Sequence, residues 1–383
     1  MKRLILLCGL LALPAGTLAQ QGDEHLARAK RILALTPLID GHNDLPWAIR
    51  NFEDAPKSVT AYDLTLRTPG HTDLERLRQG MVGAQFWSVY VPFGVAEGGY
   101  AKVQLEQIDI ARQVIEKYPD HFGLALNASD VERVFGSGRI ASLLGMEGGH
   151  AIENSLGALR AYFDLGARYL TLTHGSNIDW ADSGTDSVRI GGLSAFGEEV
   201  VREMNRLGML VDLSHTSPGT MSDALNVAEA PVIFSHSSAR GVRDHPRNVP
   251  DSILARLPGN GGVVMVTFVP SFLTADAVAT LADAVRHIEH VRRVAGIDHV
   301  GIGSDFDGIS SVPVGLEDVS TFPALFAELA RRGWSDDDLK KLAGENLLRV
   351  MRRAEATARR LQRQRPPSTK TIEEMDPAGD GPA

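Results

Sequence analysis

Short runs of apolar residues, each bounded by turn-forming residues, recur along the chain from residue 37 to residue 307. Eight such runs stand out, at residues 37–44, 83–92, 141–150, 167–174, 208–215, 231–236, 262–269 and 299–307. Their apolar residues are nearly continuous, which is typical of strands that are covered on both faces. The pattern therefore predicts the buried strands of a parallel sheet.

Amphipathic segments with recognisable helix starts separate these runs. Ser129 and Glu132 fit a capping box, and Ser217, which a proline follows, fits a cap residue before the first helical turn. Ser335, with three acids behind it, predicts a long helix over residues 335–364, because acids at its start and arginines near its end suit the helix dipole. Strands and helices thus alternate along the chain.

Eight alternating units predict the α/β class and, if the sheet closes, a (β/α)8 TIM barrel. The alternative is an open doubly wound sheet. That fold would place a glycine-rich dinucleotide fingerprint after the first strand, and none is present. The barrel is therefore favoured. No change in composition marks a second domain, so one barrel domain over residues 20–364 is expected.

The two ends of the chain differ from this domain. Lys2 and Arg3 precede an apolar run and small residues up to Ala19, a pattern that predicts a secretory signal peptide over residues 1–19, cleaved near Ala19. Cleavage would remove Cys8, which is the single cysteine, and would leave a periplasmic or secreted chain without disulfides. The tail over residues 365–383 is rich in proline, glycine and charge, and we expect it to be disordered.

The charge balance narrows the class of partner. Without Lys2 and Arg3 the chain has 37 basic and 48 acidic residues, a net charge near −11. Such a surface disfavours nucleic acids and anionic membranes. No other segment of about 18 apolar residues could span a bilayer. We therefore expect small-molecule partners, with no nucleic acid and no stable membrane insertion.

Residues that can bind a metal ion end six of the eight predicted strands. They are His42, Asp44, Glu147, His174, His215, His236 and Asp305. Each alone has a structural interpretation, as a hydrogen-bonded histidine, a turn cap or a loop carboxylate. In a TIM barrel, however, the C-terminal ends of the strands meet at the active-site face. A buried charge cluster there would be costly without a compensating cation, so a metal centre is predicted.

The types of side chain indicate the metal. Imidazole nitrogens and carboxylate oxygens without thiolates suit zinc, with manganese or cobalt as substitutes. Five candidate ligands exceed the three that usually hold one catalytic zinc, so we expect two Zn²⁺ per chain. Glu147 could bridge the ions, and a hydroxide held between ions about 3.5 to 4 Å apart would be the nucleophile.

Several motifs along the chain resemble those of the membrane dipeptidase (renal dipeptidase) family of zinc peptidases, which have a barrel of the metal-dependent amidohydrolase type. The resemblance extends from about residue 25 to residue 360. It suggests a secreted member of the bacterial type. The motifs are "DGHNDLPW" (40–47), "GMEGGHAI" (145–152), "LTLTHGSNIDWADS" (170–183), "VDLSHTS" (211–217), "IFSHSSAR" (233–240), "RNVPD" (247–251), "GSDFDG" (303–308) and "GENLLRV" (344–350).

The resemblance implies a role for each matching residue. His42, Asp44 and Glu147 would hold one zinc, and Glu147, His215 and His236 the other. Asp305 would deprotonate the bridging water and pass the proton to the departing amine. His174 would contact the oxygen of the tetrahedral intermediate. Arg247 would bind the C-terminal carboxylate of the substrate. Asp307 lies beyond the catalytic position of its motif, so we expect it to be structural or to support the site without touching a metal ion.

The resemblance also implies an activity. It points to a binuclear zinc dipeptidase that cleaves dipeptides with a free C-terminal carboxylate. Such an enzyme would tolerate a D-residue at the C-terminal position and, as some members do, open β-lactams. The family also suggests a homodimer. A second possible function is that of a related amidohydrolase that cleaves a non-peptide amide, ester or lactone. A third is that of a binding protein with a degenerate barrel. We expect the chain to differ from vertebrate members, which have disulfides and a GPI-type C-terminus. Residues 268–272, "FVPSF", lack a tyrosine that some relatives have there.

Overall fold

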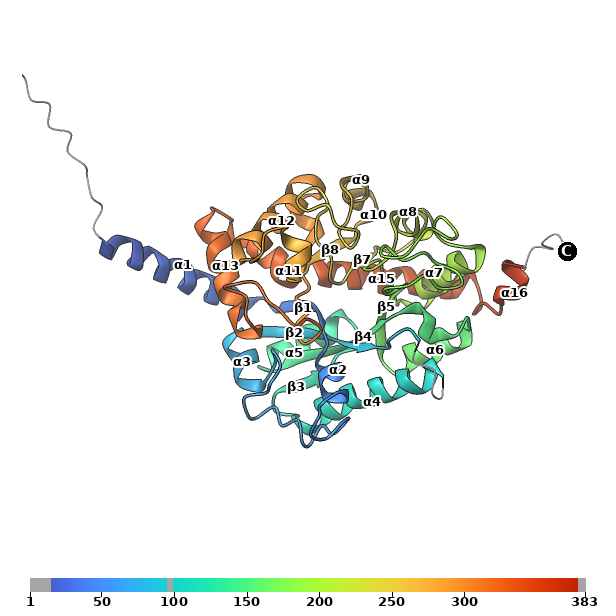
Figure 1. The fold of residues 1–383 in the computed structure, drawn as a ribbon, viewed down its shortest axis with the longest axis horizontal. Coiled ribbons are helices and arrows are strands. Elements are labelled where there is room, and N and C mark those ends of the chain that lie inside the picture. The colour runs from blue at the N-terminus through green and yellow to red at the C-terminus, as the bar shows by residue number, and fades with distance from the viewer. Residues whose placement is uncertain (1–14, 95–98, 378–383) are drawn as a thin grey trace, which may run out of the picture.

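Nine parallel strands form the centre of the molecule (Figure 1). The computed structural model describes residues 15–94 and 99–377. Within these ranges the strands are β1 (Leu38–Asn43), β2 (Val82–Tyr90), β3 (Phe122–Leu124), β4 (Ile140–Glu147), β5 (Ala167–Thr171), β6 (Leu210–Asp212), β7 (Ile233–Phe234), β8 (Val263–Val266) and β9 (Val300–Ile302). Eight of the nine correspond to the eight strands predicted from the sequence.

The sheet closes into a barrel, as predicted. Its strand order runs from β2 through β1, β9, β8, β7, β6 and β5 to β4, and β2 also pairs with β4. The β2–β4 ladder runs from the pair Ala84 and Ala141 to the pair Tyr90 and Glu147. Every strand of the ring therefore has a neighbour on both edges, which gives the closed (β/α)8 TIM barrel.

The strand β3 was not predicted from the sequence. Its three residues pair with the first residues of β4, along the edge that β5 occupies further on. Three residues are too few to show a period in the pattern of apolar positions. The strand lies outside the ring of eight and leaves the closure unchanged.

Helices cover the outside of the barrel (Figure 1). They are α1 (Ala15–Leu35), α2 (Leu45–Arg50), α3 (Leu74–Gln79), α4 (Tyr100–Lys117), α5 (Ala128–Gly136), α6 (Leu156–Asp164), α7 (Ala195–Leu207), α8 (Pro218–Val227), α9 (Asp251–Leu254), α10 (Leu257–Asn260), α11 (Pro270–Leu273), α12 (Leu281–Ala295), α13 (Phe322–Arg331), α14 (Asp336–Lys340), α15 (Asn346–Gln364) and α16 (Ile372–Met375). None of these described helices is both long and apolar enough to cross a membrane.

The observed N-cap residues of α5, α8 and α14 can be compared with the predicted ones. Ser217 and Ser335 cap α8 and α14, because the side chain of each accepts a hydrogen bond from a backbone N–H of the first turn. The cap of α5 is Asn127 and not Ser129, because the Asn127 side chain accepts from the backbone N–H of Asp130. The predicted helix over residues 335–364 consists of α14 and α15, joined by one π-helical turn.

The core has two parts, because neighbouring residues of a strand point to opposite faces. Leu38, Trp87 and Leu170 join a large apolar cluster with the surrounding helices. Ile39, Phe86, Tyr169 and others form a second cluster, together with residues of α5 and α15. Apolar burial on both faces explains why the strand sequences are so continuously apolar.

The helices α1 and α16 lie at opposite ends of the view in Figure 1. The helix α1 packs against α13; the predicted signal peptide lies mostly outside the described residues, as does Cys8. Residues 365–377 differ from the expected disorder. Ile372 and Met375 pack against the core, and the Asp376 carboxylate accepts hydrogen bonds from the Ser194 hydroxyl and the Phe196 N–H at the start of α7. Residues 378–383 lie outside the described part.

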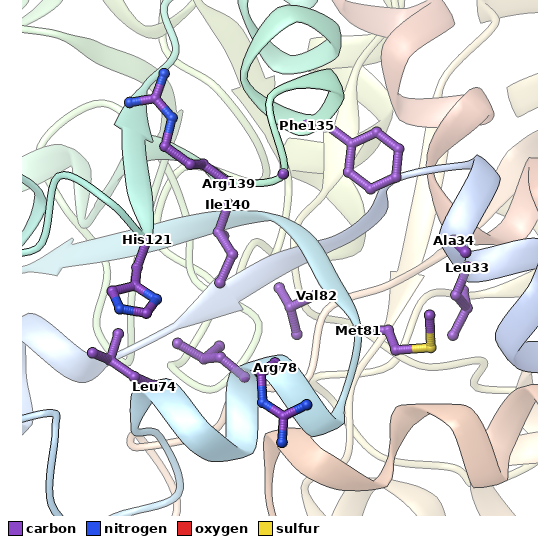
Figure 2. Close-up of a pocket in the computed structure, with 12 residues that line it drawn as sticks. Leu33, Ala34, Leu74, Arg78, Met81, Val82, His121, Phe135, Arg139 and Ile140 are labelled. Carbon is purple, nitrogen blue, oxygen red and sulfur yellow. The ribbon is translucent and has the colours of Figure 1, made fainter.

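An apolar cavity of about 250 Å³ lies at the N-terminal end of the barrel (Figure 2). Val82 and Ile140, which lie at the starts of β2 and β4, line it together with Leu33 and Phe135. This end of a TIM barrel contributes to stability, whereas catalysis takes place at the opposite end. The candidate site must therefore be sought at the other mouth.

Candidate active site

The seven predicted metal-type residues all lie at the C-terminal mouth of the barrel. His42 is in β1, Glu147 is the last residue of β4, and Asp44 is the cap position of α2. His174, His215, His236 and Asp305 follow the ends of β5, β6, β7 and β9. The structure brings all seven together. Most of them were predicted to end a strand, but the observed strands are shorter, so these residues lie in the loops just after them.

Local backbone conformation explains why the strands end early. His215 and Asp305 have φ angles of 68° and 69°, in the left-handed region that non-glycine residues seldom adopt. Residues in this region turn the chain sharply out of the strand direction, and such conformations gather at functional sites. Likewise, Asp44 does not share a strand face with His42, because it already belongs to the turn that starts α2.

Glu147 lies at the centre of the cluster, and its two carboxylate oxygens face different partners. Its Oε1 is 3.0 Å from Nε2 of His215 and 3.2 Å from Nε2 of His236. Its Oε2 is 3.5 Å from Nε2 of His42. A carboxylate that faces two ligand groups with one oxygen each can bridge two ions.

The second half of the cluster surrounds His42. Its Nε2 is 3.2 Å from Oδ2 of Asp44 and 4.0 Å from Oδ1 of Asp305. The opposite ring nitrogen, Nδ1, is 2.8 Å from the hydroxyl of Tyr169. Although His42 and Asp44 do not share a strand, their side chains converge as the sequence analysis expected.

The arrangement fits bound metal ions. Among the described residues the buried His42 Nε2 has no hydrogen-bond partner, although three carboxylates surround it, and Nε2 of His215 and Nε2 of His236 lie only 2.9 Å apart. Three groups in this cluster have ligand atoms close enough to share one ion: His42, Glu147 and His236; Glu147, His174 and His215; His42, Asp44 and Asp305. Nitrogen and oxygen donors without sulfur suit a divalent transition metal.

Electrostatics favour a cation at the same place. Burial raises the pKa of Asp305 well above its ordinary value, and the charges of Asp44 and Glu147 raise it further, whereas His42 acts in the opposite direction. Burial lowers the pKa of His215 and of His236 well below its usual range, which leaves both rings neutral. Neutral imidazoles and a concentration of carboxylates make a good site for a positive ion.

A cavity of about 290 Å³ opens beside the cluster and can hold a small ligand. Arg247 lines it and is 4% exposed. One end of its guanidinium donates a hydrogen bond from Nη2 to the His236 carbonyl, whereas the buried Nη1 has no partner within residues 15–94 and 99–377. Burial lowers the pKa of Arg247 to about 10, so the side chain remains a cation at neutral pH. An unpaired guanidinium N–H in a cavity suits an anionic group of a ligand.

The cavity walls include residues that the sequence analysis did not select. The ring centre of Tyr90, at the end of β2, lies 4.7 Å from that of His174 and 5.0 Å from that of Trp47. Its place at the C-terminal end of a predicted strand was the available signal. In the segment that lacks the tyrosine of some relatives, Phe272 lines the cavity, 5.3 Å from the Arg247 guanidinium.

Asp307 occupies a separate environment. Its Oδ1 accepts a hydrogen bond from the His71 N–H, and its side chain is fully buried. It lines a neighbouring cavity and not the one beside Glu147. Asp307 is therefore not among the residues that line the cavity beside Glu147.

Nearly the whole chain is similar to known proteins. The family model described as membrane dipeptidase (peptidase family M19) matches residues 26–365. The dipeptidase verJ of Clonostachys rogersoniana is 48% identical over 351 residues, which are 89% of this chain and 90% of that protein.

Solved structures are also similar. A metallo peptidase from Rhodobacter sphaeroides, solved with a phosphinate mimic of the dipeptide L-Ala-D-Ala, is 28% identical with a TM-score of 0.75, and the match covers 83% of this chain and 99% of that one. The probable dipeptidase PvdM from Pseudomonas aeruginosa shares the fold, with a TM-score of 0.80, 23% identity, and 88% and 100% of the two chains covered.

Gly308 offers a test of the site geometry. A Cβ atom at this position would lie 2.3 Å from Oδ2 of Asp44 and 2.8 Å from Oδ1 of Asp305. We therefore expect Gly308→Ala to displace both carboxylates and to reduce the bound metal, measured by elemental analysis of the folded protein. Gly175→Ala is the control, because its Cβ would meet nothing within 4 Å. Equal metal content in the two variants would contradict this geometry.

Proposed function

Because the chain belongs to the membrane dipeptidase family (peptidase family M19), we propose that it is a binuclear zinc dipeptidase acting on dipeptides with a free C-terminal carboxylate. The family supports a metal-dependent dipeptide hydrolase. The number of ions, their identity as zinc and the preferred substrates are our proposals. The same residues could also hold manganese or cobalt.

One observation carries the proposal. Glu147 and Arg247 line the same small cavity. The two carboxylate oxygens of Glu147 face different histidines, and the buried guanidinium of Arg247 has an N–H without a partner among the described residues. Arg247 can anchor a substrate carboxylate, and Glu147, His215 and Asp305 of the metal-type cluster line the same cavity. A cavity of about 290 Å³ that offers both features suits a dipeptide better than a longer peptide.

The ligands are assigned as the sequence analysis expected. His42, Asp44 and Glu147 would hold one ion, and Glu147, His215 and His236 the other, as the short distances from His42 to Asp44 and Glu147, and from Glu147 to His215 and His236, allow. Divalent ions bound there would supply Lewis acidity and lower the pKa of a water molecule towards neutrality.

The remaining residues act on the substrate. Arg247 binds the C-terminal carboxylate and orients the peptide bond. Asp305, which lines the cavity, takes the proton of the attacking water at its carboxylate and delivers it to the departing amine. His174, whose pKa burial lowers, is neutral and can donate a hydrogen bond to the oxygen that becomes negative during attack.

We propose that the enzyme accepts a D-residue at the C-terminal position. The Rhodobacter sphaeroides relative, solved with a mimic of L-Ala-D-Ala, supports this extension. Hydrolysis of β-lactams, which also contain an amide beside a carboxylate, is proposed as a secondary activity. We further propose export to the periplasm or the medium after removal of residues 1–19, and assembly as a homodimer.

The alternative is a related amidohydrolase that cleaves a non-peptide amide, ester or lactone. The free N–H of Arg247 favours the dipeptidase, because an ester or lactone without a carboxylate would leave this buried cation without a partner. The two functions differ in substrate and not in metal chemistry.

Metal removal tests the central proposal. We expect a chelator to abolish the hydrolysis of a panel of dipeptides with L- and D-residues at the C-terminal position, and Zn²⁺ to restore it. Amidated dipeptides, which lack the carboxylate, are the matched controls and should react poorly. Activity that survives complete removal of metal would refute the mechanism, and equal rates on amidated substrates would favour the alternative.

Arg247→Ala tests the carboxylate anchor. Loss of a hydrogen bond to a charged group costs about 2 kcal/mol, so we expect KM for dipeptides to rise roughly 30-fold. Arg243→Ala is the control, because Arg243 follows the same strand but lines the space beside the catalytic cavity. Steady-state kinetics that show the same KM for both variants would contradict the role of Arg247.

Asp305→Asn tests the proton transfer. The amide cannot accept and pass on a proton, so we expect kcat to fall by about 10² to 10⁴-fold. The metal content should remain at the wild-type level, because Asp305 is not assigned as a ligand. Loss of one ion would instead make Asp305 a ligand, and an unchanged kcat would remove it from the mechanism.

A further inference from the structure

A buried carboxylate that the mechanism above does not use lies behind the histidine cluster. Asp212 is the last residue of β6, and Ser235 directly follows β7; both are fully buried. Ser235 is also the residue before His236, one of the assigned ligands. The hydrogen bonds among these three side chains determine where the proton of the His236 ring lies.

Asp212 accepts four hydrogen bonds. Its Oδ1 accepts from the backbone N–H groups of Ser214, at 3.1 Å, and of Ser235, at 2.8 Å. Its Oδ2 accepts from the hydroxyls of Thr171 and Ser235, each at 2.5 Å. An ionised carboxylate is an acceptor only, and it matches four donors. The single hydroxyl proton of Ser235 is therefore committed to Asp212; the next oxygen, Oγ of Ser214, is 3.4 Å away.

His236 must then be the donor to Ser235. Its Nδ1 lies 2.8 Å from Oγ of Ser235. Because the Ser235 proton is already used, this contact is a hydrogen bond only if Nδ1 carries the ring proton. A neutral imidazole has one N–H, so Nε2 has a free lone pair. This nitrogen faces Oε1 of Glu147 at 3.2 Å and Nε2 of His215 at 2.9 Å.

We infer that Asp212 is a positioning residue which, through Ser235, fixes the Nδ1–H tautomer of His236 and so prepares Nε2 to bind a divalent cation. The inference rests on the proposed function, because His236 is taken as a metal ligand. Partners of a ligand's second ring nitrogen commonly set its tautomer and orientation. In this chain a serine hydroxyl stands between the carboxylate and the ring.

The other two ligand histidines differ from His236. The Nδ1 of His42 contacts the Tyr169 hydroxyl at 2.8 Å, and this hydroxyl lies 3.3 Å from the Gly41 carbonyl, to which it can donate. The Nδ1 of His215 has no partner among the described residues. Within the described part of the chain, His236 is thus the ligand whose tautomer depends on a buried charge.

Asp212→Asn would reverse this chain of donors. The amide oxygen must take the place of Oδ1, because two backbone N–H groups point at it. The amide N–H₂ then faces the hydroxyls of Thr171 and Ser235 and donates to them. Ser235 becomes free to donate its own proton to Nδ1 of His236, which moves the ring proton to Nε2. A comparable change from aspartate to asparagine produces the wrong histidine tautomer in serine proteases.

Two further variants separate this effect from simple damage to the core. Ser235→Ala removes the acceptor of the Nδ1 proton and should leave a mixture of tautomers. Ser237→Ala is the control, because Ser237 is buried in the same cluster and its hydroxyl donates to Ser214, 3.2 Å away. Circular dichroism and thermal unfolding establish which of the variants are folded.

The test combines ring ¹⁵N NMR of the metal-free protein with calorimetric Zn²⁺ titration. The His236 signals, identified by their loss in His236→Gln, should show Nδ1–H in the wild type and in Ser237→Ala, Nε2–H in Asp212→Asn and a mixture in Ser235→Ala. We expect Zn²⁺ affinity to fall about 10 to 100-fold in Asp212→Asn and Ser235→Ala, and to stay near the wild-type value in Ser237→Ala.

An unchanged tautomer or an unchanged Zn²⁺ affinity in folded Asp212→Asn would overturn the inference. If that variant does not fold, Ser235→Ala decides in the same way. A wild-type protein that binds Zn²⁺ but cleaves no dipeptide would refute the proposed function alone, because the tautomer and affinity measurements do not use activity.

Discussion

The carboxylate of Glu147 is the group around which the candidate site is built. It is a buried negative charge at the end of β4, and its two oxygens face different sets of imidazole nitrogens, Oε1 towards His215 and His236 and Oε2 towards His42. Burial of a charge is costly unless opposite charge compensates it. The remainder of the site can be understood as the means by which the fold holds this charge and its ligands in place.

Barrel closure provides that means. The ladders set Glu147 beside Tyr90 on one side and Thr171 on the other, and Thr171 beside Asp212. Residues far apart in the sequence thus share one layer at the C-terminal mouth. Turns that follow the strands then bring His215 and Asp305 inward at the cost of left-handed backbone conformations.

Fully buried carboxylates lie in the strands that lead to the candidate ligands. Asp40 accepts from the N–H and the hydroxyl of Ser304, as Asp212 does from Ser235. Each carboxylate ties its strand to the loop that follows a neighbouring strand, so each stiffens the backbone beside a histidine. In a low dielectric, buried hydrogen-bond networks of this kind specify one arrangement of the side chains around the candidate site. Arg247 lines the same cavity as Glu147 and Asp305.

The pattern of apolar residues determined the eight strands of the ring, their order along the chain and the fact that polar side chains stand at their C-terminal ends. Barrel geometry then made it predictable that these side chains meet, because every parallel strand ends at the same mouth. The roles given to individual residues came from the resemblance to a family, and they stay predictions here.

Only the tertiary structure decided the finer points. Asp44 joins His42 from a turn and not from a strand, residues 365–377 pack against α7, and β3 is too short to leave a pattern. The free N–H of Arg247 and the hydrogen bonds from Asp212 through Ser235 to His236 likewise had no signal in the sequence. The physical reason is the same in each case. A periodic pattern reports which face of an element is buried, whereas the pairing of donors with acceptors depends on distances between segments that are remote in the chain.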